Sequence, residues 1–208
     1  MKIAHDITPV VSEKLAVWPG DVPFRRTMSA TLASGDAVDL SSIHTTVHLG
    51  AHTDGPNHYR KGTPGIGERS LEPYLGPCQV MAVAVGHNNR VGVHHLTGPI
   101  LAPRLLFRTS TFPDPTRWNS DFAALSPELV HHLADRGVCL VGIDTPSIDP
   151  QHSKLLESHQ AVADRDLCIL EGIQLDGVQD GLWTLIALPL RLVGLDASPV
   201  RAVLLDPA

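Results

Sequence analysis

Four side chains of the types that bind metals fall within one stretch of eleven residues, at His48, His52, Asp54 and His58. Imidazole and carboxylate groups suit zinc and similar divalent metals. A helix could bring His48 and His52 to one face but not Asp54, and the glycine and proline residues of the stretch disfavour a helix. A straight strand would separate His48 and His58 by about 33 Å, too far for a shared site. The spacing therefore predicts a metal-binding strand-and-loop that bends at its glycines and proline.

Histidine alone is weak evidence for a metal, because the chain contains 12 of them. Other close pairs, His94–His95 and His131–His132, are not expected to be ligands. A single histidine is more often a surface residue or a hydrogen-bonded core residue. The combination of two histidines and an aspartate at i, i+4 and i+6, with a glycine on either side, is what favours metal binding here.

The composition favours one compact domain spanning residues 1–208, since 43% of the residues are hydrophobic and only 18% are charged. A formal net charge of −6 offers no basic surface for nucleic acid. No apolar run approaches the 18 residues of a membrane helix, and the first residues lack the apolar core of a signal peptide. We expect neither nucleic acid nor a membrane as a partner.

Three widely spaced cysteines, Cys78, Cys139 and Cys168, each lie in or beside an apolar run. This pattern is typical of buried, reduced thiols and predicts a cytoplasmic protein. A catalytic thiol is the less favoured alternative.

Strands outnumber helices in the expected order of elements. The clearest helix spans 126–137, where Ser126 can cap the start, Pro127 suits the first turn and Gly137 can close the end. The apolar run that follows, 138–143, predicts a strand leading into acidic residues, a common α/β arrangement. Further strands are expected at 3–9, 24–32, 80–85, 105–109, 167–170, 183–188 and 200–205, with a turn at 17–21 and a loop at 59–72. The fold class is therefore α/β, mixed and strand-rich with few helices.

One stretch rarely completes a metal site, so further ligands should come from the second half of the chain. Glu171 is the strongest candidate, because a carboxylate at the end of a buried strand costs desolvation free energy unless it is paired or bound to a metal. For His159, the residue pattern alone favours a structural role. The other candidates are Asp144, Asp149, His152 and Asp176, of which Asp149 and His152 are expected to support the structure or the ligands.

The stretch from His48 to His58 resembles the signature H-x-G-T-H-x-D-x-P-x-H of the cyclase-like metal hydrolases. Within that family the chain most resembles the bacterial kynurenine formamidases (arylformamidases), and this resemblance covers nearly the whole chain. The segments that carry it, besides 48–58, are 18–21, 142–147, 188–194 and 197–203. One position departs from the signature, since Ala51 stands where threonine is usual. The missing hydroxyl can loosen the hydrogen bonding around His52 but removes no ligand.

This resemblance implies two zinc ions per subunit, bridged by Asp54. The first zinc would also be bound by His48 and His52, and the second by His159 and Glu171. The resemblance further implies a β-barrel-like central sheet and a homodimer. It gives two residues roles toward the substrate: His58 as the general acid/base and Trp18 as a contacting aromatic. From the residue alone, Trp18 would be a core tryptophan.

The implied reaction is the hydrolysis of N-formyl-L-kynurenine to L-kynurenine and formate, a step of tryptophan breakdown. Two zinc ions that share a water lower its pKa. An imidazole that titrates near neutral pH can carry a proton to the departing arylamine, and an indole face can stack on the substrate ring. No G-x-S-x-G motif is present, which counts against the serine-dependent formamidases.

Three alternatives stay open. A related metal hydrolase could act on another aryl amide or a lactam such as isatin. A metal-binding protein without turnover would keep the ligands but would have no use for His58. A structural zinc ranks last, because such sites are usually rich in cysteine. Manganese or another divalent ion could occupy the same ligands.

Overall fold

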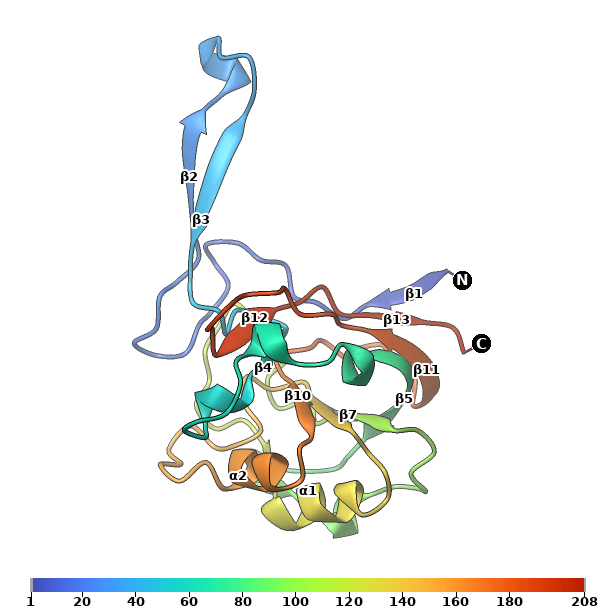
Figure 1. Cartoon of the computed structure of the whole chain (residues 1–208). Helices are drawn as coiled ribbons and strands as arrows, with labels where there is room; N and C mark the ends of the chain where they lie inside the picture. The colour runs from blue at the N-terminus through green and yellow to red at the C-terminus, as the bar shows by residue number, and fades with distance from the viewer. Residues whose placement is uncertain (1, 208) are drawn as a thin grey trace.

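A seven-stranded mixed sheet forms the centre of the molecule (Figure 1). The computed structural model describes residues 2–207. In spatial order, the strands are β1 (Ile3–Asp6), β13 (Val203–Leu205), β11 (Gly181–Ile186), β5 (Leu75–Ala82), β7 (Arg104–Arg108), β9 (Leu140–Ile143) and β10 (Cys168–Leu170). Strands β5, β7, β9 and β10 run parallel, whereas the pairs β1–β13, β13–β11 and β11–β5 are antiparallel. The mixed, strand-rich α/β class predicted from the sequence is confirmed.

The central strands are mainly apolar because each contributes to two cores. On β7, Leu105 and Phe107 belong to one apolar cluster and Leu106 to the other, as the alternation of a strand requires. The cluster of Leu105 and Phe107 also contains the buried faces of α1 (Pro127–Ala134) and α2 (Glu157–Asp164). Burial on both faces explains why these strands appear in the sequence as continuous apolar runs.

The two helices begin in different ways. The hydroxyl of Ser126 accepts a hydrogen bond from the Leu129 amide at 3.1 Å, and Pro127 occupies the first turn, so α1 begins as predicted. Helix α2 was not predicted, because its cap is not local: Leu156, with φ 50°, precedes it without a capping side chain. The distant Asp149 carboxylate instead accepts hydrogen bonds from the amides of Ser158 and His159. Between residues 2 and 207, no helix has the length and apolarity needed to span a bilayer.

The barrel-like closure expected for the central sheet is not found. Among the described residues, the hydrogen-bonded order ends at β1 on one side and β10 on the other, so the sheet is open. Closure fails because β10 has only three residues and the chain beyond it pairs elsewhere: Glu171 forms a bridge with His52 of β4 (His52–Asp54). Strand β4 pairs in turn with β12 (Ala197–Pro199). This small sheet therefore lies against the end of the large one.

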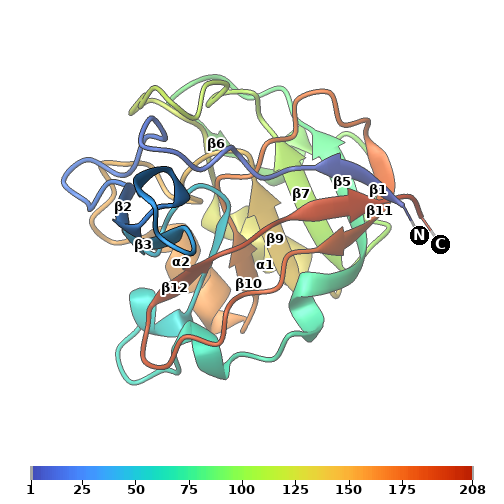
Figure 2. The same cartoon turned by 90° about the horizontal axis from the view of Figure 1, so that it is seen from above.

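A hairpin of β2 (Arg25–Ala30) and β3 (Leu40–His44) projects from the body of the molecule (Figure 1). Almost all of its side chains are exposed. Seen from above, the two chain ends lie side by side on the other side of the molecule (Figure 2), because β1 pairs with β13. The remaining short elements are β6 (Arg90–Val91), β8 (Ala124–Leu125) and the 3-10 turns Leu32–Ser34, Pro56–His58, Ile66–Glu68, Glu72–Tyr74 and Val93–His95.

The cysteines are free thiols, as predicted. Cys78 and Cys168 are buried, whereas Cys139, just before β9, is half-buried. Burial raises the pKa of the Cys78 thiol to about 12 and also raises that of Cys139. Raised pKa values keep these two thiols protonated and poorly reactive near neutral pH.

Candidate metal centre

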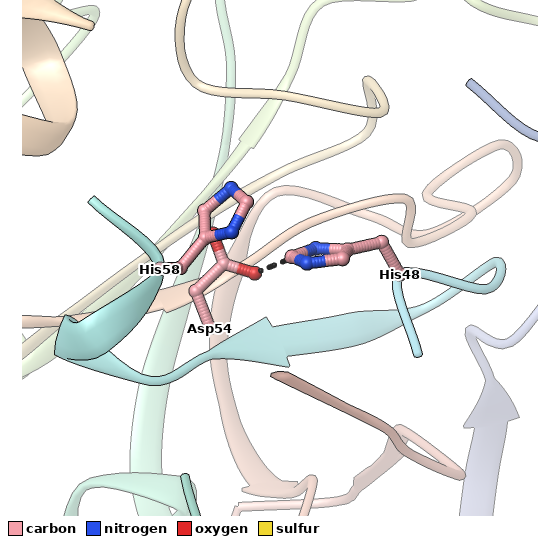
Figure 3. Close-up of side chains that lie close together, drawn as sticks. All are labelled: His48, Asp54 and His58. Atoms are coloured by element: carbon pink, nitrogen blue, oxygen red, sulfur yellow. Dashed lines mark ion pairs between the residues drawn. The ribbon is translucent and has the colours of Figure 1, made fainter. Parts of the chain in front are cut away.

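The stretch 48–58 adopts the bent strand-and-loop form that its glycines and proline predict. His52 and Asp54 lie on β4, and His58 ends the 3-10 turn that starts at Pro56. Gly50 takes a positive φ of 56° ahead of the strand. The side chains of His48, Asp54 and His58 are thereby gathered at one place (Figure 3), with His48 Nδ1 3.2 Å from Asp54 Oδ1.

Glu171 reaches the centre through its backbone. Its amide donates to the His52 carbonyl at 2.9 Å, and the His52 amide donates to the Glu171 carbonyl at 3.1 Å. This reciprocal pair sets the two side chains next to each other, with His52 Nε2 3.2 Å from Glu171 Oε2. Both are buried. The placement agrees with the expectation that a carboxylate at the end of this strand needs a cationic partner.

His159 enters the centre from the first turns of α2 and is also buried. Its Nδ1 donates to Asp149 Oδ2 at 2.8 Å, which leaves Nε2 facing Asp54 Oδ2 at 3.5 Å and Glu171 Oε1 at 3.6 Å. In the same way, His52 Nδ1 donates to the Gly50 carbonyl at 2.9 Å and leaves Nε2 facing the centre. A hydrogen bond on the far ring nitrogen is what orients a metal-binding histidine.

Asp54 lies between all of these groups. Its Oδ1 faces His48 and His52, and its Oδ2 faces His159. Both oxygens are buried, and the imidazoles that face them are the only hydrogen-bond donors near them among the described residues. Burial opposes ionisation, yet the imidazoles of His159 and His48 hold the pKa of Asp54 well below its usual range. A buried carboxylate is costly unless positive charge lies beside it, so this position favours protonated imidazoles or a bound metal ion.

The carboxylates of the centre also change the pKa values of the imidazoles. Burial alone would lower their pKa values, but neighbouring carboxylates reverse the effect. Asp149 and Asp54 raise the pKa of His159 to about 10, and Asp54 and Asp196 raise that of His48 to about 9. Without metal, both rings therefore carry protons near neutral pH. A bound ion would take the place of those protons, so metal binding should release them.

The separations of the ligand atoms fit a metal ion. Two ligand atoms that are about 2.0–2.2 Å from a tetrahedral zinc lie about 3.3–3.6 Å apart, and the pairs that join the five expected ligands measure 3.2–3.6 Å. Two groups can each hold an ion, one of His48, Asp54 and His58 and the other of His52, Asp54 and Glu171. Asp54 belongs to both groups, but the groups differ from the expected ligand sets, because His52 lies with Glu171 rather than with His48 and His159 belongs to neither. The assignment of ligands to each ion therefore stays a prediction.

Asp196 was not predicted as part of the centre. It directly precedes β12, and the pairing of β12 with β4 brings it beside the histidines. Its Oδ2 lies 3.0 Å from His48 Nε2 and 3.4 Å from His58 Nδ1. The available signal was its place next to segment 197–203, which carried part of the family resemblance.

His58 differs from the other histidines of the centre because about one third of its side chain is exposed. Partial burial lowers the pKa of His58, outweighing the neighbouring carboxylates. The ring is therefore neutral near neutral pH and able to accept a proton. Of the remaining candidates, Asp149 supports His159, whereas His152 and Asp176 are exposed and outside the centre.

A cavity of about 270 Å³ opens onto the metal centre. His48, His52, His58, His159 and Glu171 form one part of its wall, and Trp18, Phe112 and Trp118 form another. The Trp18 and Trp118 rings lie edge to face with centroids 5.3 Å apart. Trp18 thus lines the cavity, whereas its contact with a substrate stays a prediction. Phe112 and Trp118 were not predicted, because nothing in their local sequence distinguishes them from core aromatics.

Comparison with known proteins agrees with this arrangement. A solved structure described as a potential metal-dependent hydrolase with cyclase activity superposes with a TM-score of 0.81 at 26% identity, covering 96% of each chain. Isatin hydrolase A from Ralstonia solanacearum shares the fold, with a TM-score of 0.81 at 21% identity over 96% of this chain and 90% of that one. The fold and the centre therefore define a metal-dependent hydrolase.

The sequence comparisons are more specific. The family described as "Putative cyclase" matches residues 5–150. The kynurenine formamidase of Bordetella pertussis is 47% identical over 206 residues, which cover 98% of each protein. The chain belongs to this cyclase family and, within it, groups with the kynurenine formamidases.

Proposed function

We propose that the protein hydrolyses N-formyl-L-kynurenine to L-kynurenine and formate. One observation carries the proposal: a single cavity joins the His–Asp–Glu centre to an aromatic wall that includes Trp18. An aryl formamide needs both features, a site that activates water and a surface that receives its ring. The 47% identity to a kynurenine formamidase over nearly the whole chain supports this choice of substrate.

The metals are proposed to be two zinc ions per subunit. His48, His52 and Asp54 would hold the first, and His159 and Glu171 would complete the second with Asp54 as the bridge. Imidazole and carboxylate ligands suit zinc. The absence of thiolate from this set is typical of hydrolytic rather than structural zinc sites. When bound, such ions lower the pKa of a water and stabilise the developing oxyanion.

His58 is proposed to move the proton that the reaction requires. Its ring is neutral near neutral pH, because burial lowers its pKa, so it can accept a proton from the attacking water. It can then return that proton to the arylamine nitrogen, which is a poor leaving group as an anion. Asp196 Oδ2, 3.4 Å from His58 Nδ1, is placed to stabilise the imidazolium that forms between the two transfers.

The test is a hydrolysis assay with N-formyl-L-kynurenine, followed by absorbance, before and after chelation. We expect activity that is lost with the metal and restored by zinc. An isatin-type lactam is the comparison substrate, since an isatin hydrolase shares the fold. The proposal would be contradicted if the zinc-loaded, folded protein hydrolysed the lactam and left the formamide intact. That result would favour a lactam hydrolase.

We also propose a cytoplasmic homodimer in which each chain forms one domain. Three free cysteines support a reducing compartment. The hairpin supports the dimer, because Leu40 and Ile43 are 57% and 66% exposed on an arm that projects from the body (Figure 1). An isolated two-stranded hairpin is only marginally stable in water, so a second copy that covers this arm would stabilise it.

A further inference from the structure

A tight turn holds Trp18 and an acidic residue side by side. Asp21 donates its amide hydrogen to the Trp18 carbonyl at 2.9 Å, which closes a four-residue turn. Pro19 and Gly20 occupy the two middle positions, and Gly20 has a φ of +93°, as a type II turn requires at that position. The first and last Cα atoms of such a turn are less than about 7 Å apart. The turn therefore carries an indole and a carboxylate as one rigid unit.

Both side chains of this turn line the cavity that opens onto the metal centre. The indole ring of Trp18 is anchored by edge-to-face contacts with Trp118 and Phe122. The Asp21 carboxylate is tied to the turn by one hydrogen bond, which Oδ1 accepts from the Val22 amide at 2.8 Å. Its position relative to the ring is thus set before any ligand enters.

Among the carboxylates that line the cavity, Asp21 is the one with an oxygen available to bind a ligand. Three carboxylates line the wall. Glu171 faces the histidines of the metal centre. Asp144 accepts hydrogen bonds at both oxygens, from the amides of Thr109 and Ser110 and from the Thr109 hydroxyl. Within residues 2–207, the Val22 amide is the one hydrogen-bond donor to the Asp21 carboxylate, and it leaves Oδ2 available.

Near Trp18 and Asp21, the charges of the cavity wall favour a cationic group on the ligand. No lysine or arginine lies among the described residues that line it. The four histidines of the wall belong to the metal centre. A ligand carboxylate beside Asp21 would therefore find no lysine or arginine, whereas an ammonium would find the Asp21 carboxylate. The indole face of Trp18 also attracts a cation placed over it.

We infer that Asp21 determines specificity by pairing with the α-ammonium group of the substrate. This inference rests on the proposed function, because N-formyl-L-kynurenine joins an aryl ring to an ammonium through a short chain. The ring contacts Trp18, the ammonium pairs with Asp21, and the α-carboxylate points toward solvent. Asp21 is a binding residue in this arrangement and takes no part in bond breaking.

The test compares Asp21→Asn with the zinc-loaded wild type on three aryl formamides. N-formyl-L-kynurenine has both charged groups, its decarboxylated analogue keeps only the ammonium, and its deaminated analogue keeps only the carboxylate. Glu13→Gln is the matched control, because Glu13 is an exposed acid of the same N-terminal segment that does not line the cavity. Asparagine can keep the hydrogen bond from Val22, so the turn should survive.

For Asp21→Asn we expect KM to rise roughly ten- to hundred-fold for both ammonium substrates, with kcat little changed, as the loss of a charged hydrogen bond predicts. The deaminated substrate should show equal KM values in variant and wild type, and Glu13→Gln should match the wild type on all three. An equal loss on all three substrates, or no change on any, would overturn the role of Asp21 while leaving the formamidase function intact. A wild type inactive on all three would overturn both.

Discussion

Asp54 is the residue on which the centre depends most, because its two buried oxygens face three histidines. Asp54→Asn removes the negative charge shared by both proposed ions. We expect metal affinity to fall by more than about 100-fold, beyond the effect of altering a residue that only supports a ligand. Metal content after dialysis, measured by mass spectrometry, checks this. Asp176→Asn, at an exposed aspartate outside the centre, should keep its metal.

The geometry around His58 is compatible with two roles, that of a metal ligand and that of a general acid/base. It groups with His48 and Asp54 as a potential ligand, yet its exposure and lowered pKa suit proton transfer. For His58→Ala we expect kcat to fall by about 10²–10⁴ with metal content unchanged, the usual effect of losing a general acid/base. His94→Ala, at an exposed histidine, is the control. If metal is lost together with turnover, His58 is a ligand and the acid/base assignment is wrong.

The residues of the centre differ in whether the nearby sequence is enough to predict their role. His48, His52, Asp54 and His58 were predictable, because they lie in one stretch whose spacing and glycines restrict its conformation. Asp149 and Asp196 become partners of the histidines only through the capping of α2 and the pairing of β12 with β4. Asp149 was expected in a supporting role only because it follows a predicted strand, and the signal for Asp196 was its place next to segment 197–203, so the nearby sequence does not show which histidine either residue contacts. Glu171 lies between these cases, since the physical cost of its position predicted a partner but not which one.

At the scale of elements, the same distinction separates α1 from α2. Every signal that starts and ends α1, from Ser126 to Gly137, is within three residues of its ends, so its position was predictable. Helix α2 depends on Asp149, which is eight residues before its start. The apolar strands were found because burial on both faces leaves continuous hydrophobic runs. Strand β3 was missed because its side chains are exposed and show no such run.

The join between β4 and β10 depends on a glycine next to Glu171. Gly172 has a φ of +65°, and a Cβ there would lie 2.2 Å from the Gly50 carbonyl oxygen. For Gly172→Ala we expect the free energy of unfolding to fall by at least about 3 kcal/mol, because backbone strain and a clash with main-chain atoms combine. Chemical denaturation of the metal-free protein measures this. Metal affinity should fall too, since the His52–Glu171 bridge must shift.

Gly177→Ala separates the two causes. Gly177 also has a positive φ, +76°, but a Cβ there would meet no atom within 4 Å. This variant should lose only about 1 kcal/mol, the cost of a left-handed conformation for an alanine, and should bind metal normally. Equal losses in the two variants would show that close approach at Gly172 does not matter, and the account of this join would be wrong.

At the scale of the whole molecule, the projecting hairpin exposes apolar side chains that no contact within the single chain covers. The register of β2 and β3 pairs Arg26 with Ile43 and Met28 with Ser41, so Met28 and Ile43 share one face of the arm. Both are exposed, at 39% and 66%. Monomeric proteins rarely expose apolar side chains on an arm that makes few contacts with the body, and such surfaces mark interfaces.

The charges of the arm favour a second copy of this chain as the partner. Arg25 and Arg26 lie at its base, whereas Asp36 and Asp39 lie in the loop at its tip. Two arms that pair side by side about a two-fold axis, tip to base, would set each acidic tip against a basic base. A surface complementary to itself in this way is what a two-fold dimer requires.

Replacing both Met28 and Ile43 by serine should therefore convert a dimer into a monomer. We expect light scattering during size-exclusion chromatography to give twice the chain mass of 22.4 kDa for the wild type and the chain mass for the double variant. The body should stay folded, since neither side chain belongs to an apolar core. Leu155→Ser, at a leucine that is 73% exposed away from the arm, should remain dimeric. A monomeric wild type would refute the dimer, and a dimeric double variant would place the interface elsewhere.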